Sequence, residues 1–462
     1  MLLILFSATF LVLVLRRDEI AVAAILFSFF SVCYMLLNPD IMVVRFGGWL
    51  PPFGIVWVLD KFNLFFALIV TGVSSFVAVY SLKYIKERRY RFYTLLCLQT
   101  IGLLGISLTG DIFNLYVFFE ILSVSSYALV AFFLDKRAIE GAFKYLIAGS
   151  LTSTFILIGI GMLYGLTGTL NFADLASKVS LASPYIVALG LMIAGFSLKA
   201  TIIPFHAWKP DAIEGTPAPV GAVFTTASTA IGVYGILRIL FIFNLIQLNW
   251  VLILFGVFTM LVGAFMALAQ VNVKRMLAYS GISQIGYVVM ASGFGTLLGL
   301  TAGMYHLFNN AILKSILFMG AGIAIYVTGK DNLNGMGMRN TPLMVCMGIG
   351  LLSLSGIPPL NGFVSKWLIF MASWEISPVL TALAIIASAI TLAYSFKIFS
   401  AIFLTTERVE KDVPKILLIP VVILTIICVL IGVFPQIGMN IVEPAANALL
   451  NHSQYITAVM GG

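Results

Sequence analysis

The chain has few charged residues, few histidines and few cysteines. Asp, Glu, Lys and Arg make up 10% of its 462 residues, whereas hydrophobic residues make up 61%. Soluble proteins carry about 25% charged residues, so this composition excludes a soluble globular enzyme. Iron–sulfur and zinc sites need clustered ligands, but the cysteines stand apart in apolar runs without a CxxC pair. We therefore interpret these four thiols as small buried side chains: Cys33, Cys97, Cys346 and Cys428.

Signatures of cofactor binding are also missing. The sequence contains no GxxxxGK[ST] phosphate-binding loop, and its three histidines, His206, His306 and His452, are too dispersed to suggest haem or zinc. We predict no cofactor and no metal, because the chain shows no means of binding a nucleotide or a redox centre. The net charge of +8 resides largely in loops between apolar runs, and we expect a lipid bilayer rather than nucleic acid as its surroundings.

Long hydrophobic runs predict an all-α polytopic membrane protein, because about 20 apolar residues cross a bilayer as one helix. Fourteen runs qualify, near residues 1–15, 20–37, 62–82, 92–109, 112–134, 142–164, 185–207, 217–243, 250–270, 277–295, 298–327, 342–371, 378–403 and 415–434. The tail 437–460 has mixed polarity and is expected along the membrane surface.

The loop charges predict the orientation. Of the 26 Lys and Arg residues, 17 fall in alternate loops, Lys209 among them, and three fall in the other loops. Cytoplasmic loops collect Lys and Arg, so both termini are expected outside the cytoplasmic membrane. Three basic residues within spans lie near span ends, where long side chains reach water: Lys144, Arg238 and Lys397.

Four ionisable residues lie deeper in the spans: Glu120, Lys199, Lys314 and Lys366. Each charge there costs about 2.5–3.5 kcal/mol on insertion scales, which makes it a functional candidate. Helical spacing adds polar neighbours to these residues. Glu120 shares a face with Tyr116, Ser123 and Tyr127; Lys314 follows His306 and Asn310 at four-residue steps; and a nearby span carries Ser280, Ser283, Gln284 and Tyr287.

Such polar stripes either hold helices together or move protons. A buried lysine changes its protonation when its carboxylate partner moves or is neutralised. Because four ionisable groups each have polar neighbours, we favour a proton relay.

Two spans are predicted to be broken helices. Lys199 precedes Pro204, and Lys366 follows Gly356-Ile357-Pro358-Pro359. Proline inside a span frees backbone carbonyls, and ion-coupled transporters use such interrupted helices in corresponding halves. The pattern GFxxK occurs at 195–199 and 362–366, five spans apart. An odd offset reverses the orientation and indicates an inverted repeat.

We therefore divide the chain into four parts. Three N-terminal spans occupy 1–91, the first repeat or half-channel 92–243, the second 250–404, and a C-terminal helix with its tail 405–462.

Several ordered motifs resemble one family. They are DIFNLYVFFE at 111–120, PFHAWKPDA at 204–212 (PxHxWLPDA in the family), KRMLAYS at 274–280, and the segments 306–314 and 356–366. The family is that of antiporter-like membrane subunits, which includes the large membrane subunits of complex I and membrane-bound hydrogenases and the D-type component of Mrp-type Na+/H+ antiporters. The similarity runs from about residue 60 to 410.

This resemblance implies fourteen helices in two inverted five-helix repeats, within a complex of other membrane subunits. It implies that Glu120 tunes Lys199, that Lys314 links the halves, and that Lys366 exchanges protons with one side. His206, His306, Asn310, Tyr116, Ser123, Pro204 and Pro358 would support this relay. The ions implied are protons, with sodium coupling left open.

Two positions depart from the family pattern. Ala230 stands where a lysine or histidine is frequent, and Asn310 where a histidine is common. Both differences leave open that the chain is a structural or partly silenced paralogue in a redox-driven complex. A secondary transporter for an organic solute is the other alternative. The parent complex stays open among an antiporter, a hydrogenase and a dehydrogenase. It therefore also stays open whether the chain is part of an enzyme.

Overall fold

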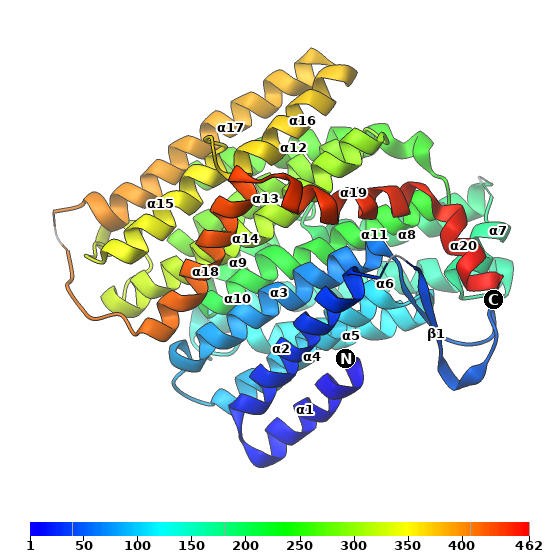
Figure 1. Ribbon diagram of the computed structural model, residues 1–462, viewed down its shortest axis with the longest axis horizontal. Coiled ribbons are helices and arrows are strands. Elements are labelled where there is room, and N and C mark those ends of the chain that lie inside the picture. The colour runs from blue at the N-terminus through cyan, green and yellow to red at the C-terminus, as the bar shows by residue number, and fades with distance from the viewer. Residues whose placement is uncertain (39, 181, 407, 462) are drawn as a thin grey trace.

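The computed structural model describes residues 1–38, 40–180, 182–406 and 408–461, and most of them are helical (Figure 1). The chain begins with the helices α1 (Leu2–Leu15) and α2 (Asp18–Leu36). A two-stranded antiparallel sheet follows, in which β1 (Met42–Arg45) pairs with β2 (Val56–Leu59). The all-helical prediction did not include this hairpin. Its turn needs the positive φ angles of Gly47 and Gly48, which glycine adopts readily.

The first half of the bundle starts with α3 (Lys61–Tyr84) and continues to residue 242. Aspartate side chains cap α5 and α6, where Asp111 and Asp135 accept hydrogen bonds from backbone N–H groups of the first turn. The helices after α3 are α4 (Arg89–Leu108), α5 (Ile112–Val130), α6 (Lys136–Thr167), α7 (Phe172–Lys178), α8 (Ser183–Ala200), α9 (Trp208–Gly215), α10 (Ala218–Val223) and α11 (Thr229–Ile242). A π-helical segment, Phe224–Ser228, joins α10 to α11.

The second half runs to the C-terminal end. Its helices are α12 (Asn249–Ala269), α13 (Val273–Ser292), α14 (Leu297–Thr328), α15 (Thr341–Ser355), α16 (Asn361–Ile376), α17 (Pro378–Phe399), α18 (Lys415–Val433), α19 (Gln436–Leu450) and α20 (His452–Met460). α19 crosses α3, α11 and α14 (Figure 1). The hairpin α1–α2 and the group α15–α17 lie at opposite ends of the bundle, with α3 and α14 between them.

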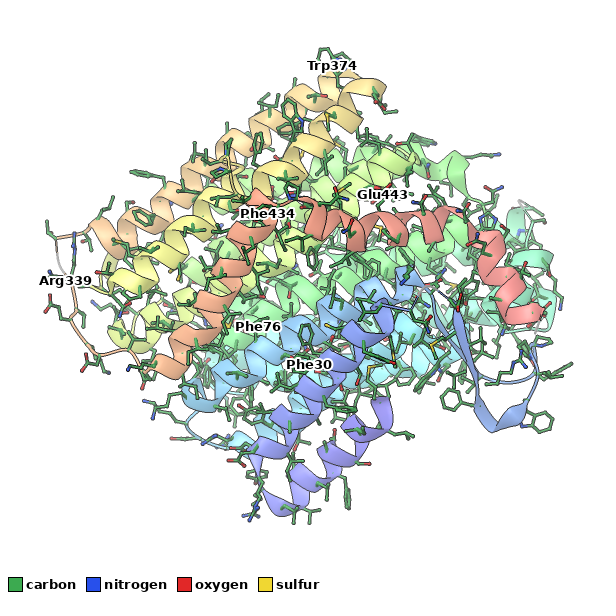
Figure 2. The ribbon with its side chains drawn as sticks, viewed as in Figure 1. Phe30, Phe76, Arg339, Trp374, Phe434 and Glu443 are labelled. Carbon is green, nitrogen blue, oxygen red and sulfur yellow. The ribbon has the colours of Figure 1, made fainter. Side chains whose placement is uncertain are left out.

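Eleven helices in the described ranges are long and apolar enough to cross a membrane, and α1 and α15 are shorter apolar helices. Large apolar side chains such as Phe30 and Trp374 are exposed on the surface of the bundle (Figure 2). Such a surface suits lipid rather than water, and the chain is an integral multi-pass membrane protein. The count of fourteen spans stays a prediction.

Both predicted helix breaks are present. α8 ends at Ala200 and α9 begins at Trp208, so that residues 201–207, with Pro204, separate them. α15 ends at Ser355 and α16 begins at Asn361, with Pro358 between them. Thr201 and Gly356 end the first helix of each pair in the left-handed conformation.

The basic residues near span ends behave differently from one another. Lys144 is exposed and lies near the start of α6, and Lys397 lies near the end of α17, as expected. Arg238 was expected to reach water, and this was wrong. Its guanidinium is buried, with Nη2 2.9 Å from Asp60 Oδ2 and 2.6 Å from Asn63 Oδ1. Asp60, the residue just before α3, neutralises the charge, so the side chain needs no water.

Candidate functional site

The first buried lysine lies at the end of a half-helix. Lys199 occupies the last turn of α8 and is only 4% exposed. Its Nζ donates to Tyr145 Oη on α6 at 2.8 Å. The Tyr145 ring stacks on Trp208, with 4.3 Å between ring centroids, which ties the beginning of α9 to this point. Carbonyl groups at the C-terminal end of a helix carry partial negative charge, so this position suits an ammonium group.

Glu120 approaches Lys199 from α5. The two groups interact electrostatically, but no ion pair within 4.0 Å joins them in the described part of the chain. One Glu120 carboxylate oxygen is buried without a hydrogen-bond partner among the described residues. Tyr116 and Ser123 lie one turn away on either side, half-buried and buried respectively. The carboxylate is therefore near the lysine without being locked to it.

The sequence patterns did not predict that a second lysine is buried. Lys209 was counted among the basic loop residues, but its side chain is fully buried. Its Nζ donates to Thr229 Oγ1 at 2.8 Å and to Thr201 Oγ1 at 3.2 Å. The helix α9 folds back into the bundle after the break, which carries Lys209 inward. The signal that could have revealed it is its place beside Trp208, a residue unsuited to a hydrated loop.

The third lysine occupies the centre of α14. Lys314 is fully buried, and its Nζ donates to Ser280 Oγ on α13. The carbonyl oxygen of Leu277 lies 3.5 Å from the same Nζ. The sequence had placed Ser280 on a polar stripe of the neighbouring span, and the structure brings the two stripes together.

His306 and Asn310 continue the α14 stripe. His306 Nδ1 lies 2.9 Å from Ser365 Oγ, and its Nε2 lies 3.1 Å from Gln284 Oε1. Asn310 is buried, and neither its Oδ1 nor its Nδ2 has a hydrogen-bond partner among the described residues. Both residues precede Lys314 on this face of α14, and His306 contacts Ser365, the residue before Lys366.

The fourth lysine, Lys366, belongs to the second turn of α16 and is buried. Its Nζ donates to Ser388 Oγ on α17 at 2.9 Å, and Ser388 Oγ donates to the Ser355 carbonyl at 3.0 Å. Ser355 is the last residue of α15. Like Lys199, Lys366 therefore has its ammonium group near the C-terminal end of the half-helix that precedes a break.

These side chains lie within electrostatic reach of one another. When both members are charged, Lys199 and Lys209, Lys209 and Lys314, and Lys314 and Lys366 repel each other, and His306 interacts with the last two lysines. We call this set, together with Glu120, the buried row. The other expected residues lie at the breaks. Pro204 and Pro358 are exposed, and His206 is half-buried with Nδ1 unpartnered among the described residues.

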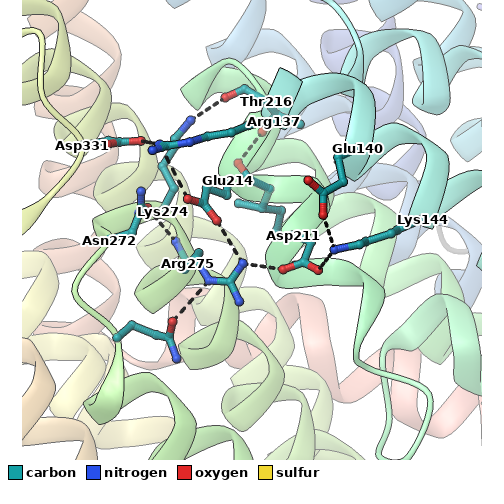
Figure 3. Close-up of polar contacts among 12 residues, drawn as sticks. Arg137, Glu140, Lys144, Asp211, Glu214, Thr216, Asn272, Lys274, Arg275 and Asp331 are labelled. Atoms are coloured by element: carbon teal, nitrogen blue, oxygen red, sulfur yellow. Dashed lines mark hydrogen bonds and ion pairs between the residues drawn. The ribbon is translucent and has the colours of Figure 1, made fainter. Parts of the chain in front are cut away.

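A cluster of ion pairs joins α6, α9 and α13 (Figure 3). Asp211 on α9 pairs with Arg275 on α13 and with Lys144 on α6, the latter at 2.7 Å. Arg275 also pairs with Glu214 at 2.9 Å, and Arg137 reaches both Glu214 and Asp331. The cluster joins helices of the first and second halves of the chain through α9, the helix that carries Lys209.

The electrostatics of Asp211 follow from these contacts. Burial raises the pKa of its carboxyl group, but hydrogen bonds and charge interactions with Lys144 and Arg275 act in the opposite direction and prevail. The pKa therefore lies below its usual value, and Asp211 stays ionised at neutral pH.

The fold and the buried row define a multi-pass membrane protein whose interior holds ionisable side chains. Residues 109–391 match the family described as "NADH:quinone oxidoreductase/Mrp antiporter, TM", and residues 52–93 match "NADH-Ubiquinone oxidoreductase (complex I), chain 5 N-terminus". The chain belongs to this family of antiporter-like membrane subunits, as its motifs predicted.

Curated relatives come from two kinds of complex. The chain is 34% identical to the N-type component of NADH-quinone oxidoreductase from Desulforudis audaxviator, over 86% of each chain. It is 32% identical to the D-type component of the Na(+)/H(+) antiporter from Bacillus subtilis, over 92% of this chain and 90% of the relative.

Solved structures agree with this assignment. A chain of the Mrp complex from Dietzia sp. DQ12-45-1b superimposes with a TM-score of 0.93 at 26% identity, covering 99% of this chain and 98% of the other. A chain of the membrane-bound sulfane sulfur reductase, an archaeal respiratory membrane complex, gives 0.91 at 31% identity with the same coverage.

Proposed function

We propose that the chain translocates protons as one subunit of a multisubunit membrane complex, along the buried row from Glu120 to Lys366. One observation carries this proposal: four lysines are buried, and the Nζ of each donates a hydrogen bond to a hydroxyl group. They are Lys199, Lys209, Lys314 and Lys366. No ion pair in the described part of the chain neutralises any of them.

The chemistry follows from this burial. Membrane-buried ionisable groups are costly and mark ion pathways. A buried amine without a fixed carboxylate partner gains or loses its proton as neighbouring charges change. Protonation at one lysine then disfavours protonation at the next, so that movement of Glu120 toward Lys199 alters the whole row. Hydroxyl groups of Tyr145, Ser280 and Ser388 both donate and accept hydrogen bonds, which proton transfer requires.

The proposal includes the two half-channels, 92–243 and 250–404, arranged as inverted five-helix repeats between 1–91 and 405–462. It is supported by the two helix breaks and by an ammonium group near the end of α8 and of α15. The excess of Lys and Arg in alternate loops supports both termini outside a cytoplasmic membrane. The relatives support a Mrp-type or respiratory complex as the partner, and sodium as a candidate coupled ion.

The test uses the assembled complex in inverted membrane vesicles, with a pH-gradient dye as readout. Lys199→Met and Lys366→Met should each lower dye quenching at least tenfold at equal amounts of complex. Lys178→Met is the control, because Lys178 is an exposed lysine paired with Asp174 on α7. Wild-type quenching by both row variants would overturn the proposal.

Two further measurements separate the alternatives. A silenced scaffold predicts full pumping with Glu120→Gln, whereas the relay predicts a loss. A solute transporter predicts saturable solute uptake by the isolated chain. Repeating the vesicle assay with and without Na+ shows whether sodium is the coupled ion.

A further inference from the structure

Lys209 lies in the middle of the buried row, although α9 is a short helix of eight residues after the first break. Its ammonium interacts electrostatically with Lys199 on one side and with Lys314 on the other. Both of its described side-chain partners are threonine hydroxyls, Thr201 at the break and Thr229 at the start of α11. A lysine buried only for structure would be expected to have a carboxylate partner, as Arg238 has in Asp60.

We propose that Lys209 is a proton-carrying member of the relay that connects the first half of the chain to Lys314. This inference rests on the proposed function. It gives α9 the central group that α11 lacks, since Ala230, next to Thr229, is a buried apolar residue. With Lys209 in this role, the proton path through the first half of the chain has no gap at Ala230, and this half is not silenced.

The path from Lys209 toward Lys314 is lined by hydroxyl groups. Thr229 accepts the Lys209 hydrogen bond, and its own hydroxyl donates to the Phe224 carbonyl at 2.7 Å. Thr225, four residues earlier on the same face, has a buried hydroxyl without a hydrogen-bond partner among the described residues. A Cβ atom on Gly281 would clash with the Cγ2 methyl group of Thr225 and lie 4.0 Å from Lys314 Cε, so the Thr225 and Lys314 side chains approach each other beside Gly281.

The transfer step is balanced. One Nζ–H bond of a protonated lysine breaks, and the proton passes to a hydroxyl or water oxygen, which releases its own proton to the next neutral amine. A new Nζ–H bond forms there, and the positive charge has moved by one residue. No electron is transferred and no other reactant is needed.

The experiment compares three variants with wild type in the assembled complex, again by dye quenching in inverted vesicles. Lys209→Met removes the ammonium, and Lys209→Gln keeps a hydrogen-bond donor for Thr229 without a titratable group. Both should lower proton transport at least tenfold at equal complex content. Lys209→His keeps a titratable group with an ordinary pKa of about 6.5, so transport should persist with a pH profile displaced to lower pH.

Three outcomes would overturn the inference. Wild-type transport with Lys209→Gln would show that Lys209 acts only through hydrogen bonding, and wild-type transport with Lys209→Met would show that it is dispensable. A histidine variant with the wild-type pH profile would show that this side chain does not titrate during transport. If Lys199→Met and Lys366→Met lose transport while Lys209→Gln retains it, this inference fails and the proposed function stands; if all three retain it, both fail.

Discussion

Lys366 reaches back across the second helix break and packs against Gly356, although it belongs to the helix that follows the break. A Cβ atom on Gly356 would lie 2.9 Å from Lys366 Cδ and 3.8 Å from its Nζ. Gly356 also follows directly after α15 as its C-cap, with φ of 85°, a conformation that side chains disfavour. Two features of the break therefore require glycine at position 356: the left-handed backbone and the close approach of the Lys366 side chain.

Gly356→Ala is therefore expected to lower both stability and transport. The left-handed backbone costs roughly 1–2 kcal/mol with a side chain, and the new methyl group displaces the Lys366 stem. Gly329→Ala is the matched control, because Gly329 ends α14 with φ of 71° and has open space around it. Thermal melting should show a loss for both variants, larger for Gly356→Ala because the Lys366 stem must also move, and only Gly356→Ala should lower dye quenching. Equal transport by the two variants would contradict the role of this contact.

Asn310 offers a prediction in which stability and transport change in opposite directions. Its amide is buried without a hydrogen-bond partner among the described residues, so Asn310→Leu should be neutral or stabilising. Asn310 lies one helical turn from both His306 and Lys314 on the same face of α14, so leucine removes the polar group between them. Asn310→Leu should therefore lower dye quenching about fivefold or more.

The neighbouring Asn309 provides the contrast. It exchanges two hydrogen bonds with Asn361, at 2.8 and 3.1 Å, so Asn309→Leu should cost about 1–3 kcal/mol in thermal stability. Unchanged transport with Asn310→Leu would exclude a proton path at this position.

The Arg238–Asp60 pair is expected to hold α11 to the segment before α3. Removing one partner of a buried pair leaves an uncompensated charge and costs about 3–5 kcal/mol, so Arg238→Ala should lower the melting temperature strongly. Arg339→Ala breaks the exposed Arg339–Glu410 pair at the same 2.9 Å separation and should cost less than about 1 kcal/mol. Equal losses would show that Arg238 is not buried with Asp60.

Acid should weaken the ion-pair cluster through Asp211. Its pKa is lowered in the folded chain, since ion pairs with Lys144 and Arg275 outweigh burial. A depressed carboxyl pKa stabilises the fold above the unfolded value, about 3.9, and this stability is lost as pH falls through the folded pKa. At pH 7, Asp211→Asn should therefore have a free energy of unfolding about 1 kcal/mol lower than that of wild type, and thermal melting measures this loss. The difference should shrink below about pH 4, and a constant difference would contradict this assignment.

Sequence patterns predicted what depends on local composition. The breaks at Pro204 and Pro358 and the burial of Lys199, Lys314 and Lys366 all follow from a charge or a proline within an apolar run. These features can be read within one span, because the cost of a buried charge does not depend on the partner helix.

What sequence patterns missed depends on tertiary contacts. Lys209 lies in a segment predicted as a loop between two apolar runs, and only the return of α9 into the bundle buries it. Arg238 finds Asp60, 178 residues away in the chain, which no local window can detect. Tyr145 and Ser388, the hydroxyl partners of Lys199 and Lys366, were likewise missed, because each lies on a different helix from its lysine.

We expect protons to pass between the two halves of the chain through Lys314. The most direct measurement is proton flux into proteoliposomes that contain the purified complex, with wild-type Lys314 and with Lys314→Met at equal complex content. The variant complex is expected to assemble, and its flux is expected to fall below about one tenth of the wild-type value. Wild-type flux through an assembled Lys314→Met complex would contradict it.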